Sequence, residues 1–368
     1  FAVGLATPTA VIIATGLGAR KGILIKGGEA IEAAARTTDV VFDKSGTLTD
    51  GSFSVREVLT MPGVDREDFL IIAGSLEACS EHALAKGVVK EAKRSTIQLR
   101  KVDNFEPLPG RGLKGTVGRK SYLVGSRGLI EERGFVLSGE FLSKITAAEK
   151  AGQTLIFLAQ EEGDIVGAIS LTDRVKETAQ AAIADLQAQG LRVHLLSGDN
   201  ASAAQAVARQ CGLNAEDVHA LMKPEDKVDF LRQLKSKGRR VTAVGDGIND
   251  APALAAADVG LALGTGTDIA VESGQIVLVS PDVRGVSRAI MLSREAAHVI
   301  RLNLIVAFTA NMFMIPYAFV DNMRPAHSAW IMALSSLLVI FNSLRLTYAG
   351  PEDGPDMSES KLAGAQKR

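Results

Sequence analysis

The stretch that decides the fold is Val40–Asp50, which reads VVFDKSGTLTD. Its apolar run ends abruptly at a carboxylate, Asp43, and a short turn rich in Gly and Thr follows. This pattern predicts a buried parallel strand that brings Asp43 to the carboxyl edge of a sheet, where α/β folds place their ligands. A carboxylate at that edge can be a turn residue, a metal ligand or a nucleophile.

Two later stretches repeat the pattern. Val193–Leu196 runs into SGD at Ser197–Asp199, and Val241–Val244 runs into GDGIND over residues 245–250. Because the carboxyl ends of parallel strands meet at one edge of a sheet, these three ends are predicted to converge. Strands alternating with Ala-rich helices over residues 167–280 predict a doubly wound α/β fold. Asp residues that merely form turns would not explain three such motifs.

The net charge, cysteine content and mean hydropathy of the chain exclude several classes of protein. The net charge of −1 argues against a nucleic-acid-binding surface. The two cysteines, Cys79 and Cys211, lie far apart, which predicts no disulfide framework and no zinc site and fits a reducing compartment. A mean hydropathy of +0.16 is high for a soluble protein and indicates membrane segments. The chain opens with Phe1 and has no basic region before its first apolar run, so we expect a fragment and not a secretory signal.

Two segments near the C-terminus are long and apolar enough to span a bilayer. Residues 299–320 would form a helix about 33 Å long, and residues 326–348 form a second candidate span. The short link between them predicts a hairpin. The first apolar run, 1–18, is short for a full span, and the basic pair Arg20-Lys21 after it indicates the cytoplasmic side.

Between the first two strand motifs the pattern changes to an inserted α+β lobe, with helices expected over Glu67–Cys79 and Ala83–Lys93. A further short helix is expected over Glu29–Arg36. The predicted organisation is a partial transmembrane helix with its cytoplasmic exit (1–28), the first part of the α/β domain (29–52), the inserted lobe (53–163), the second part of the α/β domain (164–290), two transmembrane helices (291–349) and a disordered tail (350–368).

In order and spacing, the three motifs resemble those of the P-type ATPases, ion pumps whose catalytic domain is haloacid-dehalogenase-like. Asp43–Thr49 is similar to the family's phosphorylation motif, with Ser45 where the family usually has Thr. Ser197 also stands where the family mostly has Thr, and both replacements keep the hydroxyl. The segment GLATP at Gly4–Pro8 resembles the helix that follows the Cys-Pro-Cys motif of heavy-metal pumps, the copper-transporting class. The resemblance implies that ATP phosphorylates Asp43. It also implies that the α/β parts (29–52 and 164–290) form a phosphorylation domain and that the inserted lobe (53–163) is a nucleotide-binding domain.

The residues around Asp43 suit phosphoryl transfer, which needs charge neutralisation and positioning. Lys223 can neutralise the phosphoryl group, and hydroxyls and backbone N–H groups at Thr47, Ser197 and Gly198 can donate to its oxygens. Mg²⁺ prefers hard oxygen ligands. The candidates are Asp43, the Ser45 carbonyl, Asp246 and Asp250, with support from Asn249. The resemblance implies that Asp199 lies near the nucleotide.

The inserted lobe carries residues that resemble the adenosine-binding site of heavy-metal pumps. They are Glu81, His82, Gly110, Gly112, Gly125 and Ser126. The family has Pro where this chain has Ala83, and Asn at Ser126. The glycine pattern over 110–115 would by itself indicate only a loop. Its place between two phosphoryl-transfer motifs favours ATP as the ligand.

A soluble phosphatase of the same fold is the alternative enzyme. Such enzymes carry a second Asp two residues after the nucleophile, which hydrolyses the acyl phosphate, and here that position is Ser45. A hydroxyl is a poor acid or base near neutral pH, so the intermediate should persist, as a pump requires. No Thr-Gly-Glu actuator loop occurs in the sequence, so we expect these residues alone to form a phosphoenzyme but turn over slowly. A non-pumping nucleotide sensor is a further alternative.

The transported ion is predicted from the last two apolar segments. Met332, Ser335 and Ser336 share a helix face, and Asn342 extends it. Asn311 is a polar residue in the preceding span. Thioether sulfur favours Cu(I), and the MALSS sequence at 332–336 resembles copper-exporting pumps, although their Tyr before the Asn is Ala310 here. A divalent metal such as Zn²⁺, or purely structural polar contacts between helices, are the alternatives.

The resemblance also implies a setting. It predicts a multi-pass integral membrane protein with cytoplasmic catalytic domains, in a membrane that the sequence does not identify. The implied partners are membrane lipid, a copper chaperone and an N-terminal part of the same protein with an actuator domain, further helices and metal-binding domains. No nucleic-acid partner is expected.

Overall fold

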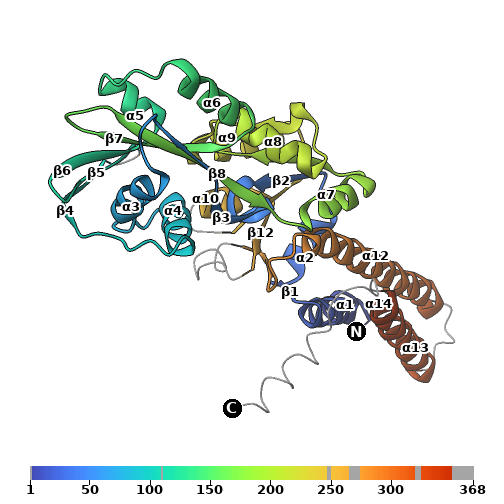
Figure 1. The fold of residues 1–368 in the computed structure, drawn as a ribbon. Coiled ribbons are helices and arrows are strands. Elements are labelled where there is room, and N and C mark those ends of the chain that lie inside the picture. The colour runs from blue at the N-terminus through green and yellow to red at the C-terminus, as the bar shows by residue number, and fades with distance from the viewer. Residues whose placement is uncertain (1, 109–110, 247–249, 265–273, 320–324, 350–368) are drawn as a thin grey trace, which may run out of the picture. The chain divides into compact units, whose positions relative to one another are not determined.

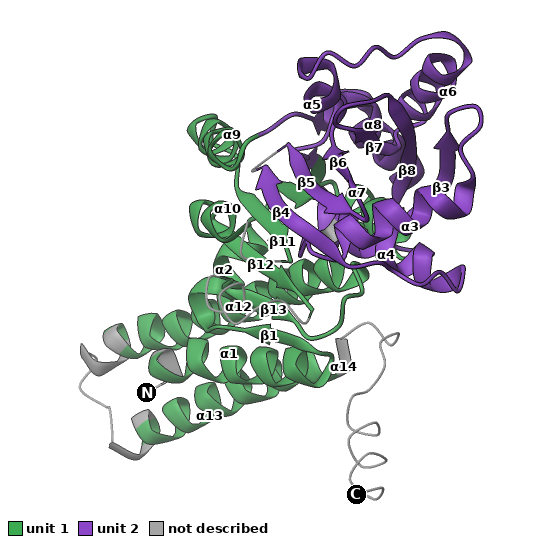
Figure 2. Ribbon diagram, turned by 60° about the vertical axis from the view of Figure 1, so that its left-hand side comes forward, with its two compact units in different colours: residues 1–43, 178–194, 223–368 green, residues 44–177, 195–222 purple. Residues whose placement is uncertain are grey.

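The computed structural model describes residues 2–108, 111–246, 250–264, 274–319 and 325–349. The chain forms two compact units, coloured separately in Figure 2. Unit 1 comprises residues 1–43, 178–194 and 223–368, and unit 2 comprises residues 44–177 and 195–222. The chain passes from unit 1 to unit 2 directly after Asp43. The six segments expected from sequence remain a prediction, since each unit draws on several of them.

Unit 1 is built on a mostly parallel sheet. Val40 and Phe42 in β2 are fully buried, as expected for a strand covered on both faces. The neighbours follow the order β1-β13-β12-β11-β2-β9. The pairs β13–β12, β12–β11 and β11–β2 are parallel, and the β1–β13 pair is antiparallel. The strands are β1 (Ile23–Ile25), β2 (Asp39–Asp43), β9 (Arg192–Leu196), β11 (Val241–Gly245), β12 (Val259–Leu263) and β13 (Ile276–Leu278). The predicted strands and the doubly wound fold are confirmed.

Short helices connect these strands, as Figure 1 shows. They are α2 (Gly28–Ala35), α7 (Ala179–Ala188), α9 (Pro224–Ser236) and α10 (Ala251–Ala256). The helix expected over Glu29–Arg36 is thus α2. Pro224 begins α9, where its missing N–H costs no helical hydrogen bond. That start fixes the position of α9 residues relative to the end of β2.

Three longer helices complete unit 1 and pack side by side (Figures 1 and 2). They are α1 (Ala2–Arg20), α12 (Arg284–Phe319) and α13 (Pro325–Leu344), and the short α14 (Leu346–Ala349) follows. Ala6, Ala10 and Ala14 on α1 are fully buried, so the backbones can approach closely.

The two C-terminal helices differ from the predicted spans at the start of α12 and at the end of α13. The helix α12 begins at Arg284, well before the expected residue 299, and α13 ends at Leu344, before the expected residue 348. Among the described residues, Arg284–Met314 is long and apolar enough to cross a membrane, and Ala329–Leu344 is a shorter apolar helix. Most of the link between the helices, and the tail over 350–368, lie outside the described residues.

Unit 2 contains an antiparallel sheet of order β3-β8-β7-β6-β5-β4. Its strands are β3 (Thr49–Thr60), β4 (Val102–Leu108), β5 (Gly112–Val117), β6 (Lys120–Gly125), β7 (Thr154–Gln160) and β8 (Ile165–Val175). The end of β9 and β10 (Val218–His219) pair in parallel in this unit. The inserted α+β lobe predicted from sequence is confirmed.

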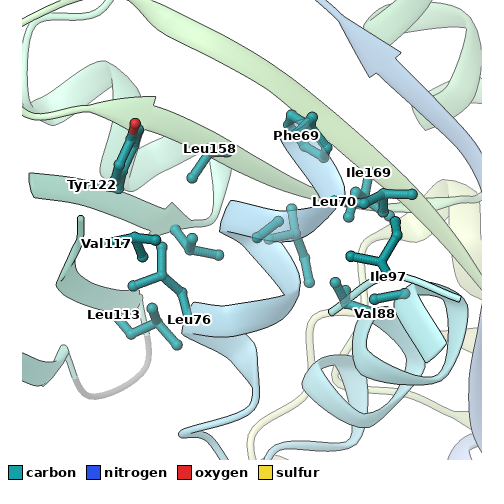
Figure 3. Packing of buried hydrophobic residues seen from close by; sticks show 14 of the residues in the cluster. Phe69, Leu70, Leu76, Val88, Ile97, Leu113, Val117, Tyr122, Leu158 and Ile169 are labelled. Atoms are coloured by element: carbon teal, nitrogen blue, oxygen red, sulfur yellow. The ribbon is translucent and has the colours of Figure 1, made fainter. Parts of the chain in front are cut away.

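The helices of unit 2 cover its sheet. They are α3 (Arg66–Glu77), α4 (Ala83–Arg94), α5 (Arg127–Glu132), α6 (Gly139–Lys150) and α8 (Ala201–Cys211), with short turns at Lys44–Leu48 and Ala215–Asp217. Figure 3 shows Phe69, Leu70 and Leu76 of α3 packed among side chains from the strands and α4. The helices predicted over Glu67–Cys79 and Ala83–Lys93 are α3 and α4.

Candidate active site

One group of candidate residues lies in unit 1, at the end of β2. The side chain of Asp43 is largely buried, and its Oδ1 lies 2.5 Å from Nζ of Lys227. The same ammonium lies 3.4 Å from Oδ1 of Asp250. Lys227 is in the first turn of α9. Burial lowers the pKa of Lys227, but the charges of Asp43 and Asp250 outweigh burial and raise it, so the ammonium remains charged.

Asp250 is the buried member of this group. Burial, and then the negative charge of Asp43, raise the pKa of the Asp250 carboxyl to about 7, while Lys227 opposes the shift. Asp246 also contributes negative charge. A Cβ at Gly245 would lie 2.6 Å from the Asp250 Cβ, so only glycine there leaves room for this carboxylate. With two acidic groups at one lysine and Asp246 near Asp250, acidic side chains outnumber basic ones in this group, an excess of acid.

This excess fits a divalent cation. Carboxylate oxygens suit Mg²⁺, which typically uses one or two carboxylates together with substrate phosphates. No group of three or more His, Cys, Asp or Glu in the part of the chain that the structure describes has the geometry to hold a metal by itself. Asp43, Asp246 and Asp250 therefore fit a cation that shares its ligands with a phosphate. Asn249 lies outside the described residues.

The lysine that contacts Asp43 is not the one selected from sequence. Lys223 is exposed and stands at the N-cap of α9, where its backbone N–H donates to Oδ2 of Asp226 at 2.8 Å. Lys227 lies one helical turn further on, and its side chain reaches Asp43. The capping pattern Lys223–Asp226 is the signal that could have identified Lys223 as a cap.

A second group of candidate residues lies in unit 2 and is described by itself. Lys44 is almost fully buried, is ion-paired with Asp199, and lies 4.0 Å from Oδ2 of Asp173. Thr49 donates to the same Asp173 oxygen at 2.5 Å. Burial, the largest effect, raises the pKa of Asp173. The sequence analysis named Asp199 but assigned no role to Lys44 or Asp173.

The turn after Lys44 has a shape that favours phosphate contacts. Ser45 is extended and Gly46 has a φ of +77°, which glycine adopts without strain. The Thr47 hydroxyl is fully buried and has no hydrogen-bond partner among the described residues. An unpartnered buried hydroxyl is costly, so this atom is a candidate donor to a ligand. The carbonyl of Gly46 accepts a hydrogen bond from Nζ of Lys176 at 2.7 Å.

Hydrogen bonds to its backbone hold the Ser197–Asp199 loop in place. The Ser197 hydroxyl is buried and accepts from the backbone N–H of Asp199 at 3.1 Å. The backbone of Ser197 pairs with His219 and Met222. At Gly198 an added Cβ would lie 3.4 Å from the Met222 carbonyl oxygen, an ordinary van der Waals contact.

The predicted nucleotide residues occupy the inserted lobe of unit 2. Glu81 and His82 are exposed, and Nδ1 of His82 caps α4 by accepting from the N–H of Leu84 at 3.3 Å. Ser126 caps α5. Gly110 lies outside the described residues.

Packing explains why two other positions of this lobe are glycines. Gly112 and Gly125 face each other across β5 and β6, and a Cβ at Gly112 would lie 2.1 Å from the Val124 carbonyl. A side chain there would push the strands apart. The pair therefore keeps the backbones of β5 and β6 in close contact.

Glu77 is a candidate that the sequence analysis missed. It ends α3, five residues before His82, and only 6% of it is exposed. Burial raises the pKa of its carboxyl to about 7. Near neutral pH this group can therefore donate as well as accept a hydrogen bond, which suits recognition of a nucleobase edge.

The predicted ion residues lie on α12 and α13 of unit 1. Ser335 is buried and donates to the Met332 carbonyl at 3.0 Å, and Met332 and Ser336 are half-buried. Asn311 lies on an exposed face of α12. Asn342 donates to Asn303 at 2.8 Å, a residue that the sequence analysis did not select.

Comparison with known proteins adds independent information. The haloacid dehalogenase-like hydrolase family matches residues 40–258. The chain is 40% identical over 345 residues to a probable copper-importing P-type ATPase A of Enterococcus hirae, covering 94% of this chain and 46% of that protein. It is 40% identical over 349 residues to a probable copper-exporting P-type ATPase V of Mycobacterium tuberculosis, covering 95% of this chain and 45% of that protein.

A solved structure gives a similar result. The crystal structure of a zinc-transporting PIB-type ATPase in the E2.Pi state is similar with a TM-score of 0.75 and 33% identity, covering 94% of this chain and 55% of that one. The chain thus spans about half the length of the relatives it matches. The matches extend on both sides of residues 40–258, into the helices that flank the sheet.

Proposed function

The chain belongs to the haloacid dehalogenase-like hydrolase family, and we propose that it is the catalytic and C-terminal membrane portion of an ATP-driven Cu(I) pump. The observation that carries the proposal is the pairing of Asp43 with Lys227 at the end of β2. A buried carboxylate beside a fixed ammonium suits attack on a phosphate, because the ammonium can offset the charge of the incoming phosphoryl oxygens. The resemblance to heavy-metal P-type ATPases, confirmed by the relatives at 40% identity, supports ATP as the donor.

The proposed chemistry is one phosphoryl transfer. A carboxylate oxygen of Asp43 forms a bond to the γ-phosphorus of ATP, and the bond from that phosphorus to the β,γ-bridging oxygen breaks. ADP leaves with the electron pair. Lys227 stabilises the oxygens of the transferred group, and the resemblance to the family keeps the Thr47 hydroxyl as a candidate donor. Bound Mg²⁺ would supply the remaining positive charge, held by Asp43, Asp246 and Asp250.

The nucleotide is proposed to bind in the inserted lobe of unit 2. Glu77, at the end of α3, and His82, at the start of α4, are the proposed contacts to the base. Gly112 and Gly125 keep the backbones of β5 and β6 close together, and both stay candidate contacts to the nucleotide. Glu81 and Ser126 stay on the list of candidate contacts.

The transported ion is proposed to bind between α12 and α13, through Met332, Ser335 and Asn311. The soft Met332 sulfur and the copper-transporting relatives favour Cu(I). The similarity to a zinc-transporting structure keeps a divalent ion as the second candidate. Export from the cytosol, a multi-pass membrane setting, an actuator domain in an N-terminal part and a copper chaperone belong to the same proposal.

A labelling experiment tests the function. The full-length protein is incubated with γ-labelled ATP and Mg²⁺, and the acid-quenched protein is analysed for hydroxylamine-labile label. Label is expected in the parent protein, with stimulation by Cu(I) or Ag(I) greater than by Zn²⁺. Asp43→Asn should abolish it, whereas Asp229→Asn, an exposed position on α9, should not. Absence of label in the parent would favour the nucleotide-sensor alternative.

A further inference from the structure

A buried polar cluster joins all three long helices of unit 1. The Asn303 side chain on α12 donates to the Ala6 carbonyl of α1 at 3.1 Å and to the Ser343 hydroxyl of α13 at 2.8 Å. The Asn342 amide, also on α13, donates to Oδ1 of Asn303 at 2.8 Å. We call Asn303, Asn342, Ser343 and the Ala6 carbonyl the amide cluster. Asn303, Ser343 and Ala6 are fully buried.

Asn303 is the centre of the amide cluster. Its amide nitrogen donates twice and its oxygen accepts once, and these bonds reach two other helices. The Ser343 hydroxyl in turn donates to the Val339 carbonyl of its own helix at 2.8 Å. An apolar residue at Asn303 would leave the Asn342 amide without its acceptor and the Ser343 hydroxyl without one donor in a buried setting. The bonds have strict geometry, so they fix the axial register of α12 against α1 and α13.

The amide cluster lies near the proposed ion residues. Asn311 is eight residues beyond Asn303 on α12, about 12 Å along the helix, and Met332 is ten residues before Asn342 on α13, about 15 Å. The cluster thus joins the two helices that carry the proposed ligands. A slip of one helix against the other at the cluster would change the Asn311–Met332 separation by the same amount.

The helix α12 also contacts the segment that leads to the nucleophile. Nη2 of Arg294 donates to the Thr37 carbonyl at 3.3 Å, two residues before β2 begins. Gln189, at the end of α7, donates to the Ser287 hydroxyl at 2.7 Å. The cytoplasmic end of α12 is therefore bonded to the sheet that holds Asp43, and the amide cluster lies between that end and the ion residues.

We propose that Asn303 is a positioning residue for the ion site: it sets the register of α12 against α1 and α13 and so holds Asn311 and Met332 in their binding geometry. The inference rests on the proposed function. It assigns no ligand role to Asn303, because its nitrogen and oxygen are already bonded within the protein. Its loss should weaken the response to metal without changing nucleotide binding.

The test uses the full-length protein and compares Asn303→Leu with Thr309→Val, an exposed position on the same helix. The measured quantity is the Cu(I) or Ag(I) concentration for half-maximal phosphoenzyme formation, with the dissociation constant for nucleotide measured in parallel. Asn303→Leu should raise the metal concentration about ten-fold, as the loss of one or two interhelical hydrogen bonds implies. Thr309→Val should leave it unchanged, and nucleotide binding should be unchanged in both.

A second pair of variants separates positioning from loss of folding. Ser343→Ala removes one partner of Asn303 and should shift the metal response in the same direction by a smaller factor. Asn303→Leu combined with Asn342→Leu should behave like Asn303→Leu alone, because both remove the same bond. An unchanged metal response in Asn303→Leu or Ser343→Ala, with a parent protein that responds to metal, overturns the inference alone. A parent protein that metal does not stimulate overturns the proposed function as well.

Discussion

The Lys227 ammonium lies 2.5 Å from one oxygen of Asp43 and 3.4 Å from one oxygen of Asp250. One cation therefore neutralises part of the charge of two carboxylates, of which Asp250 is the more buried. Such an arrangement fixes Asp43 in place before a phosphate arrives. The following predictions begin from this contact.

Lys227→Ala should lower the rate of phosphoenzyme formation by about 10²–10³-fold, the usual loss when a group that stabilises transition-state charge is removed. Lys223→Ala is the matched control, because the Lys223 backbone makes its hydrogen bond to Asp226 and this bond survives the substitution. Rapid-quench labelling with γ-labelled ATP gives both rates. Equal losses in the two variants would contradict the assignment of Lys227.

Ser45→Asp should shorten the lifetime of the phosphoenzyme. The new carboxylate would stand two residues after Asp43, where it can act as a general base toward water. Ser45→Thr keeps a hydroxyl and should leave the lifetime unchanged. Chase experiments with unlabelled ATP measure the decay of the label. A lifetime in Ser45→Asp equal to that of the parent would show that something other than the missing carboxylate protects the intermediate.

Gly112→Ala should destabilise the inserted lobe and weaken nucleotide binding. Its Cβ would lie 2.1 Å from the Val124 carbonyl, so β5 and β6 must separate, at a cost of about 1–3 kcal/mol. Gly128→Ala is the control, because the nearest atom to its Cβ is 4.0 Å away, in a helix that favours Ala. Thermal unfolding and nucleotide titration report the two effects. A fully stable Gly112→Ala protein would contradict the packing account.

Glu77 should make the stability of α3 depend on pH. Burial raises the pKa of its carboxyl from the ordinary value to about 7, so the folded state holds the proton more tightly than the unfolded state. The associated stability is complete below the unfolded pKa and is lost as the pH rises through about 7. The difference between about pH 5 and about pH 8 should be about 1–3 kcal/mol.

Amide hydrogen exchange across α3 in the full protein measures this effect. Comparison with Glu77→Gln at each pH removes the intrinsic pH dependence of exchange, and the glutamine variant should show no change in opening free energy. If the parent and Glu77→Gln respond alike to pH, the carboxyl does not carry the proton.

The strands and the principal motif residues could be predicted from sequence because their pattern is local. An apolar run such as Val40–Phe42 that ends in Asp43 is visible without any tertiary information. The choice between Lys223 and Lys227 is different in kind. The two are four residues apart and would share a face of a continuous helix. Only the start of α9 at Pro224 decides which side chain points to β2.

The residues that sequence analysis missed owe their roles to long-range packing. Glu77 sits in an ordinary amphipathic helix, and its burial depends on the strands and α4 around α3. Asn303 and Asn311 are two polar residues in one apolar run. They are eight residues apart and on nearby faces, so hydrophobic periodicity does not show which of the two is buried. The packing of α12 against α1 and α13 buries the first and leaves the second exposed.

The continuity of α12 has a mechanical consequence. This single helix of 36 residues donates a hydrogen bond from Arg294 to the segment that leads to β2. It makes the Asn303 hydrogen bonds near its middle. Because the Asn303 bonds hold the middle of the helix, a tilt of α12 about Asn303 would move its two ends in opposite directions. Arg284 lies about 28 Å from Asn303 along the helix, so a tilt of about 5° moves Arg284 by about 2 Å. The part of α12 beyond Asn303 then moves in the opposite direction. A displacement near the start of α12 can thus reach the residues beyond Asn303, as far as Pro316, the proline inside this helix.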